Sequence, residues 1–415
     1  MSNFFKSKKN SVYYIAEIGG NHEGSAQYAK KLTDLALKSG ADAIKYQIYT
    51  GDTLVSSLIS PDRNSHFKKF EIDSCEYINF ATLCKNNNKD FMASVWGSES
   101  LKWIDPFISI HKVGSGDLTC YPLIKLLVAT KKPIILSTGL STMSEVSDTV
   151  KYIEKLDRHY ISDKKLALLQ CTSSYPTPNE DANLYAISEL RKEFNLPVGY
   201  SDHTEGSDAI EIAISLGATI IEKHFTDTRL DKNFRDHKVS LSLDEVNIFL
   251  EKAKKIKTIL GRSEKFLTNS ELEAGHHISF RRSIYALSDI DIGSLLTEKN
   301  LTYLRPDIGI SAMNYEKLLG KTAIKDIKKG CLISEKDFQI PAQLLLNFEP
   351  NTIYQIFKKS RKSNEKKKIL DNIYNFENEK ISKNIRYENL NRQYPKDVFN
   401  LTVSVFLNAL NISFE

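Results

Sequence analysis

The feature that most constrains this chain is a regular alternation between short apolar runs and helical patterns. Eight of the runs have the length of a buried strand, and a helical pattern separates most of them. The clearest helix is expected at 26–39, because Ser25 is placed to cap its first turn and Gly40 to end it. The strands are expected at 13–18, 43–47, 91–95, 108–113, 134–137, 166–171, 198–200 and 219–223.

Eight strands that alternate with helices over about 250 residues are typical of a (β/α)8 barrel. An open doubly wound sheet is the alternative, but no Gly-x-Gly-x-x-Gly turn follows any of the expected strands. We therefore expect an α/β chain whose first domain, residues 1–262, is a TIM barrel. In such a barrel, ligand-binding groups lie at the C-terminal ends of the strands.

The expected strand ends carry polar and charged groups, which are costly inside a barrel unless they are paired or used. Two of these ends are linked by one helix, in the segments Ser201-Asp202-His203-Thr204 and Glu222-Lys223-His224. Neighbouring parallel strands would bring both imidazoles and a carboxylate together, which suits a divalent cation. The full set of strand-end groups is Glu17, Asn21, His22, Lys45, Gln47, Ser94, Lys112, Ser115, Ser137, Thr138, Gln170, Thr172, His203, Glu222 and His224.

Two of these groups, Lys45 and Lys112, supply positive charge. The loops Gly114-Ser115-Gly116 and Ser137-Thr138-Gly139 can turn backbone N–H groups toward an anion, although each can also be a simple strand-to-helix turn. Together they predict a site for a phosphate and a carboxylate.

Composition narrows the class of protein. No apolar run approaches the ~20 residues of a membrane span, and the first ten residues are polar and basic, unlike a secretory signal. Five widely spaced cysteines predict reduced thiols and a cytoplasmic location. The net charge is +5, and residues 351–415 account for it with 12 Lys and Arg against 7 Asp and Glu. The remainder is near neutral, so nucleic-acid binding by it is not expected.

The motifs resemble those of the bacterial N-acetylneuraminate (sialic acid) synthases over roughly residues 12–340. They are YIAEIGGNHEG at 14–24, IKYQ at 44–47, KVGSGD at 112–117, CTSSYP at 171–176, GYSDHT at 199–204 and EKHF at 222–225. The resemblance implies condensation of phosphoenolpyruvate with N-acetylmannosamine, or a related 2-acetamido sugar, to a nine-carbon 2-keto acid and phosphate. It also implies a divalent metal, typically Mn²⁺, with Mg²⁺ or Co²⁺ as alternatives.

Roles for individual residues follow from the resemblance together with the strand-end pattern. Glu17 and Glu222 are candidates for proton transfer or for orienting a metal-bound water, unless they only pair with Lys45 or Lys223. The other expected roles are phosphoenolpyruvate binding by Lys45, Gln47, Lys112, Ser115, Ser137 and Ser173, sugar binding by Tyr175, Asp236 and Arg305, and metal binding by His203 and His224.

Residues 281–340 contain an internal repeat that follows an expected polar linker at 263–280. The pattern D-I-x-x-G-x-L-x-x-E-K-x-L at 289–301 returns at 326–338 with Phe338 as its last residue. Two similar units predict a small, pseudo-symmetric, mostly β domain. It resembles the antifreeze-like (SAF) domain of sialic acid synthases, which implies a homodimer in which Arg305 reaches the partner's sugar site.

Three positions depart from the family pattern: Ile48 where Thr is usual, Ser173 where Asn is frequent, and Asp307 where Gly is frequent. These positions are expected near the acceptor, so the resemblance leaves the identity of the sugar open.

Residues 341–415 lie outside the resemblance and are basic and rich in Asn. A solvated or disordered extension, an association element at 398–414 and a basic tail at anionic lipid are the alternatives for them.

Two other functions remain open at this point. A pyruvate lyase of the Schiff-base class would also be a barrel with a strand-end lysine, here Lys45, Lys112 or Lys223. A non-catalytic sugar- or anion-binding barrel would keep the fold without turnover.

Overall fold

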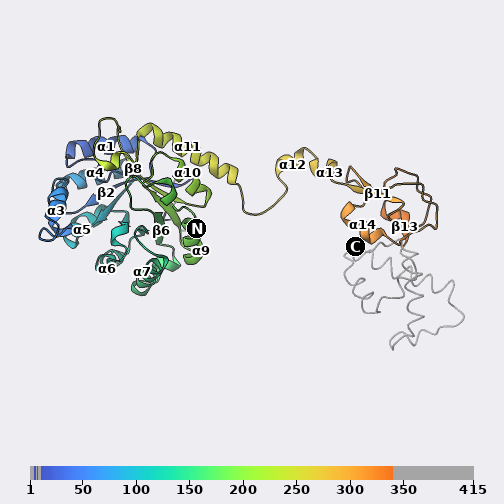
Figure 1. The fold of residues 1–415 in the computed structure, drawn as a ribbon, viewed down its shortest axis with the longest axis horizontal. Coiled ribbons are helices and arrows are strands. Elements are labelled where there is room, and N and C mark those ends of the chain that lie inside the picture. The colour runs from blue at the N-terminus through green and yellow to red at the C-terminus, as the bar shows by residue number, and fades with distance from the viewer. Residues whose placement is uncertain (1–3, 6, 8–10, 340–415) are drawn as a thin grey trace, which may run out of the picture. The chain divides into compact units, whose positions relative to one another are not determined.

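The computed structural model describes residues 4, 5, 7 and 11–339, so the extension at 341–415 lies outside the described residues. The chain divides into one compact unit that spans Met1–Ser263 and another that begins at Glu264. Each unit has a hydrophobic core of its own. The strands, the helices around them and the smaller second unit can be followed in Figure 1.

The first unit is a closed barrel of eight parallel strands. Each strand pairs with the next in sequence, and β1 also pairs with β8, which closes the sheet. The predicted TIM barrel is therefore confirmed, and the open doubly wound sheet is excluded. The strands are β1 Tyr13–Glu17, β2 Ala43–Ile48, β3 Asp90–Val95, β4 Ile110–Val113, β5 Ile134–Ser137, β6 Leu166–Cys171, β7 Val198–Asp202 and β8 Ile220–Phe225.

Helices surround this barrel, as the yellow-to-blue ribbon of Figure 1 shows. Ser25 caps the first of them by accepting a hydrogen bond from the Tyr28 amide at 3.2 Å. Among the helices that the structure describes, none combines the length and the hydropathy required to cross a lipid bilayer. They are α1 Ala26–Lys38, α2 Gly51–Leu54, α3 Pro61–Lys68, α4 Ser74–Asn86, α5 Ser98–Ile104, α6 Tyr121–Ala129, α7 Met143–Leu156, α8 His159–Ser162, α9 Ala186–Phe194, α10 Asp208–Ser215 and α11 Leu243–Leu260.

The interior of the barrel explains why the strand ends are polar. Side chains alternate between the two faces of a strand, so a residue two positions after an inward-facing one also faces inward. On seven strands an inward apolar residue is followed, two positions later, by a polar residue or cysteine that lines the mouth of the barrel. These pairs are Ile15 and Glu17, Ala43 and Lys45, Met92 and Ser94, Ile110 and Lys112, Ile135 and Ser137, Leu169 and Cys171, and Ile220 and Glu222.

The element boundaries differ from the sequence-based expectation in a few places. The fourth strand begins at Ile110 rather than residue 108, because Ile108 caps a 3-10 turn at Asp105–Phe107 and Ser109 forms a bend after it. The last two strands are longer than expected and run to Asp202 and Phe225. A short strand that the sequence did not indicate, β9 Ser240–Leu241, pairs with β8.

In the second unit, residues 281–339 are built on four short strands and isolated β-bridges, in line with the small β domain predicted there. The segment at 263–280, expected to be a linker, contains the short helices α12 Asn269–Glu273 and α13 His276–Ser279. Beyond it lie β10 Ser283–Ala286, β11 Leu301–Leu304, α14 Tyr315–Leu318, β12 Thr322–Ala323 and β13 Phe338–Gln339.

The internal repeat corresponds to a local twofold arrangement of this unit. Ile290 and Ile327, at the same position of the two repeats, exchange both backbone hydrogen bonds at 2.8 Å. The bonds around them are reciprocal as well, from the Gly293 amide to Ala323 and from the Gly330 amide to Ala286, each at 2.8 Å. The repeated sequence therefore folds into two equivalent halves that pair with each other.

Candidate active site

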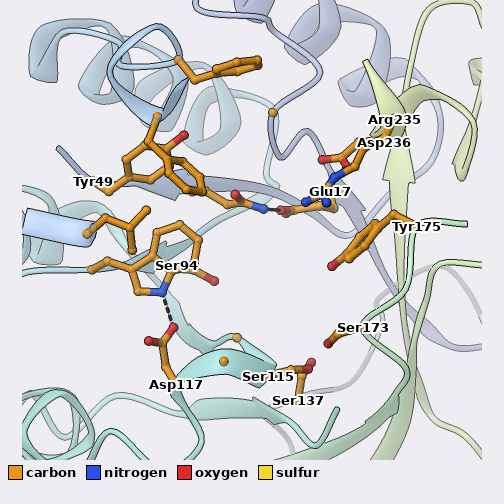
Figure 2. Close-up of a pocket in the computed structure, with 18 of the residues that line it drawn as sticks. Glu17, Tyr49, Ser94, Ser115, Asp117, Ser137, Ser173, Tyr175, Arg235 and Asp236 are labelled. Carbon is orange, nitrogen blue, oxygen red and sulfur yellow. Dashed lines mark hydrogen bonds and ion pairs between the residues drawn. The ribbon is translucent and has the colours of Figure 1, made fainter. Parts of the chain in front are cut away.

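A cavity of about 930 Å³ opens at the C-terminal ends of the barrel strands. Figure 2 shows Tyr49 on one side of it, Tyr175 and Asp236 on another, and Ser115, Ser137 and Ser173 around its edge. The first-unit residues with a predicted catalytic, substrate-binding or metal-binding role all line this cavity, namely Glu17, Lys45, Gln47, Lys112, Ser115, Ser137, Ser173, Tyr175, His203, Glu222, His224 and Asp236. Five other groups expected at the strand ends do not line it, namely Asn21, His22, Thr138, Gln170 and Thr172. Arg305 belongs to the second unit, so its role at this site remains a prediction.

Two lysines and two glutamates form a buried charged cluster at the base of the cavity. The Lys45 ammonium donates to Glu17 at 2.7 Å and lies 3.9 Å from Glu222. The Lys112 ammonium lies 3.5 Å from the other oxygen of Glu222. Glu222 thus faces two cations, whereas Glu17 faces one.

This difference shifts the pKa values of the two carboxyl groups in opposite directions. Burial opposes ionisation of Glu222, but Lys112 and Lys45, with the Ser201 hydroxyl, lower its pKa to about 2. Burial is the main cause that raises the pKa of Glu17, and the Glu222 carboxylate adds to it against the opposing effect of Lys45. Pairs of acids with separated pKa values are typical of sites that transfer protons. Glu222 also keeps one oxygen, Oε2, without a hydrogen-bond partner.

Ser115 and Ser173 lie beside Gly139, and together with Ser137 they offer hydroxyl groups to an oxyanion. The Gly139 amide donates to the Ser115 hydroxyl at 3.1 Å. A Cβ atom at position 139 would lie 2.7 Å from the hydroxyl oxygens of both Ser115 and Ser173, so a larger residue would displace these hydroxyls. Lys112 donates to the hydroxyl of Ser137 at 2.7 Å. Hydroxyl groups next to a buried ammonium are the donors that a phosphate requires.

His203 and His224 lie side by side at the ends of β7 and β8, with ring centroids 5.5 Å apart. The Nδ1 atom of His203 lies 2.7 Å from the Thr172 carbonyl oxygen, so Nδ1 carries a proton, and in the neutral imidazole Nε2 then has the lone pair. Burial lowers the pKa of His224 to about 4, and its buried Nδ1 has no hydrogen-bond partner. A neutral imidazole with an unsatisfied nitrogen fits a metal ligand.

Few of the described side chains next to His203 and His224 could bind a metal ion. Across residues 11–339 and the described residues before them, no group of three or more His, Cys, Asp or Glu side chains is arranged to hold a metal ion by itself. The nearest carboxylate to His224 is that of Asp236, with Oδ2 3.8 Å from Nδ1. The two histidines therefore fit a cation that takes its other ligands from substrate or water.

Tyr175 forms the wall next to these histidines. Its ring centroid lies 4.0 Å from that of His203, and the Arg235 guanidinium lies over the ring, 4.7 Å from its centroid. Arg235 also pairs with Asp236 at 3.4 Å. This part of the cavity offers an aromatic ring, a guanidinium and a carboxylate to a ligand.

Sequence reasoning missed the opposite wall, which is aromatic. Its residues come mainly from the segment between β2 and α4, whose mixed composition has no helical or strand period to single it out. The indole N–H of Trp96 donates to the Asp117 carboxylate, which fixes one end of this wall. The aromatic residues of the wall are Tyr49, His66, Phe67, Phe70, Trp96 and Phe234.

Lys223 does not line the cavity, although its strand ends there. Its ammonium is fully buried and donates to the Asp202 carboxylate and to the Thr204 carbonyl oxygen, each at 2.6 Å. Of the lysines considered for Schiff-base chemistry, Lys45 and Lys112 face the cavity and Lys223 does not.

A closed barrel whose strand ends present lysines, glutamates, serines and histidines to one cavity defines a class of TIM-barrel protein with its site at the C-terminal face. A family profile described as the NeuB family matches residues 32–265, and a SAF domain profile matches residues 281–339. The chain belongs to the NeuB family, and the predicted resemblance to sialic acid synthases with a SAF domain is confirmed.

Relatives of known name support this assignment. The chain is 35% identical over 336 residues to the N,N'-diacetyllegionaminic acid synthase of Campylobacter jejuni, which covers 77% of this chain and 98% of that protein. It is 34% identical to the pseudaminic acid synthase of the same species, over 82% of this chain and 99% of that protein. The crystal structure of the N-acetylneuraminic acid synthetase of Leptospira borgpetersenii is similar at a TM-score of 0.60 and 30% identity, over 65% and 91% of the two chains. The chain is thus an enzyme of the nonulosonic acid synthase family.

Proposed function

We propose that this enzyme condenses phosphoenolpyruvate with N-acetylmannosamine to give N-acetylneuraminate and phosphate. The observation that carries the proposal is the juxtaposition of two sites in one cavity: the donors Lys112, Ser115 and Ser137 for a phosphate, and the imidazoles of His203 and His224 for a metal. The relatives named as legionaminic and pseudaminic acid synthases support a synthase reaction of this class.

The proposed reaction forms one carbon–carbon bond and breaks one carbon–oxygen bond. C3 of phosphoenolpyruvate attacks the aldehyde carbon of the open-chain sugar, and the cationic C2 that results adds water. The tetrahedral adduct then expels inorganic phosphate by C–O cleavage. When bound at His203 and His224, a divalent ion, expected to be Mn²⁺ with Mg²⁺ or Co²⁺ as alternatives, would supply Lewis acidity to the aldehyde oxygen.

The residues of the charged cluster have distinct proposed roles. Lys112, Ser115, Ser137 and Ser173 bind the phosphate, and Lys45 with Gln47 binds the carboxylate. Glu222 is ionised, and its free Oε2 accepts the proton of the attacking water. The raised pKa of Glu17 allows it to hold a proton for the sugar oxygen that becomes a hydroxyl.

The acceptor sugar has a second candidate, which the aromatic wall favours. Tyr49, Phe67, Phe70, Trp96 and Phe234 offer apolar surface, which suits methyl groups better than hydroxyls. A sugar with two acetamido groups carries more such methyl groups than N-acetylmannosamine. The name of the N,N'-diacetyllegionaminic acid synthase, whose product carries two N-acetyl groups, points to an acceptor of this second kind.

We further propose a cytoplasmic homodimer in which Arg305 of one subunit contacts the acceptor bound to the other. The planar guanidinium suits the acyl carbonyl oxygen of the sugar. The five free cysteines support the cytoplasmic location.

An isotope label tests the proposed bond cleavage. Phosphoenolpyruvate labelled with ¹⁸O at its bridging oxygen should transfer the label to inorganic phosphate, because the C–O bond breaks. Label retained in the keto acid would mean P–O cleavage and would overturn the proposal.

A Schiff-base lyase would instead use pyruvate, remain active after chelation of metal and be trapped on Lys45 or Lys112 by borohydride. Sugar binding without turnover at saturating Mn²⁺ would favour a binding protein.

A further inference from the structure

A fully buried ion pair joins β7 and β8 directly behind the two histidines. Asp202 and Lys223 are paired in the strand register, and neither side chain has any exposed surface. Their carboxylate and ammonium lie 2.6 Å apart. Neither residue lines the cavity, so the pair takes no direct part in binding or chemistry there.

The pair is part of a network that encloses the backbone on both sides of His203. The Asp202 carboxylate accepts hydrogen bonds from the Thr204 amide at 2.8 Å and from the Thr204 hydroxyl at 3.2 Å. The Lys223 ammonium donates to the Thr204 carbonyl oxygen at 2.6 Å. The residues before and after His203 are thereby tied to the residue that precedes His224.

The pair lies among apolar side chains, where two buried charges do not stabilise the fold better than apolar residues would. Outward-facing neighbours on the same two strands, Tyr200, Ile221 and Phe225, belong to the hydrophobic layer between barrel and helices. Burying two charges there costs desolvation energy, and well-packed apolar residues stabilise such positions equally well or better. An ion pair instead fixes the relative position of the groups that it joins, because its hydrogen bonds require one geometry.

We propose that Asp202 and Lys223 are positioning residues that fix the separation of His203 and His224. Alternation along each strand places both histidines inward when Asp202 and Lys223 lie outward. A fixed register between the two strand ends therefore sets the distance between the imidazoles, which is 5.5 Å between ring centroids. The part of this inference that concerns metal affinity rests on the proposed function.

The test replaces both charges at once, with Asp202→Leu and Lys223→Met in the full chain, so that no unpaired charge is left buried. We expect the thermal unfolding of the barrel to be retained and phosphoenolpyruvate affinity to be unchanged. Mn²⁺ affinity, measured from the free-ion electron paramagnetic resonance signal, should fall by about 10–100-fold, as when outer-shell partners of metal ligands are lost. A crystal structure of the double variant should show the imidazoles displaced or in more than one position.

Tyr13→Phe is the matched control, because it removes a partly buried hydrogen bond to Asp90, at 2.6 Å, at the opposite end of the barrel. It should leave Mn²⁺ affinity unchanged. If the double variant does not fold, Thr204→Val decides, since it removes the hydroxyl bond to Asp202 and leaves the charges paired. We expect it to weaken Mn²⁺ binding by a few-fold.

Two results would overturn the inference: Mn²⁺ affinity equal to wild type in a folded variant, or imidazoles that keep their 5.5 Å separation in its crystal structure. A wild-type chain that binds no Mn²⁺ would instead count against the metal in the proposed function. The crystal structure of the variant would still decide whether Asp202 and Lys223 position the histidines.

Discussion

Glu17 and Glu222 approach the same ammonium group, that of Lys45, at 2.7 and 3.9 Å. They come from β1 and β8, the two strands whose pairing closes the barrel. Glu222 has a second cation, Lys112, and Glu17 does not. The closure of the barrel thereby creates two carboxyl groups with opposite pKa shifts in one cavity.

Replacing Glu222 by Gln should leave the fold intact and lower turnover by about 10²–10⁴-fold, the range for losing a general acid–base group. Ser201→Ala is the matched control, because it removes only the hydrogen bond to Glu222 Oε1 at 2.9 Å. It should lower turnover much less. Near-normal turnover of Glu222→Gln in steady-state assays would remove this residue from the mechanism.

Lys112→Met should weaken phosphoenolpyruvate binding by about 10–100-fold, because a charge-assisted contact to the phosphate is lost. Isothermal titration in the absence of sugar measures this directly. Lys131→Met, which breaks an exposed ion pair with Asp157, is the control for loss of a charge elsewhere. Equal phosphoenolpyruvate affinities of the Lys112 variant and wild type would place the phosphate somewhere else.

Subunit mixing tests the role of Arg305. Arg305→Ala and His203→Ala homodimers should both be inactive, the first through lost sugar binding and the second through the metal site. A trans arrangement predicts that mixed dimers regain one intact site of two. A mixture that stays as inactive as its parents, despite verified subunit exchange, would show that the arginine does not act across an interface.

Acid should destabilise the barrel through its buried histidines. Burial lowers the pKa of His22, His111 and His224 to about 4, below the about 6.5 of an unfolded chain. Between these values the unfolded chain binds more protons, so stability is full above about pH 6.5 and falls as pH decreases toward about 4. Each such histidine should cost about 2 kcal/mol between about pH 7.5 and pH 5.

His111→Gln isolates one of these contributions, because His111 does not line the cavity and its Nε2 contacts Asp105 at 2.9 Å. The difference in unfolding free energy between the two pH values should shrink by about 2 kcal/mol. Both tryptophans, Trp96 and Trp103, lie in the first unit, so their fluorescence reports its unfolding in urea. An unchanged pH dependence would mean that His111 is protonated in the fold at about pH 5.

The barrel and most of its site could be predicted because both depend on strand periodicity. Ile15 and Glu17, or Ile135 and Ser137, face inward together, and parallel strands carry such pairs to one rim. The two imidazoles were predicted from the same rule. Their neighbours Asp202 and Lys223 were visible in the motif, but their pairing depends on the register between two strands, which sequence alone does not fix.

The aromatic wall could not be predicted for a different reason. Phe67 and Phe70 lie at and just beyond the end of α3, a short helix whose residues are mainly exposed, and no period marks their direction. Phe70 packs against Phe234, from a loop more than 150 residues later, with ring centroids 4.9 Å apart, and Phe67 packs against Tyr49 at 5.3 Å. Such tertiary contacts leave no local pattern.

The reaction itself can be measured with the full chain, phosphoenolpyruvate, Mn²⁺ and a panel of hexosamines with one or two acetamido groups. We predict release of inorganic phosphate in step with a nine-carbon 2-keto acid detected by mass spectrometry. This release should need both an acceptor and the metal, and a chelator should stop it. The absence of phosphate release with every 2-acetamido sugar, at saturating Mn²⁺ and with folded protein, would contradict the proposed synthase activity.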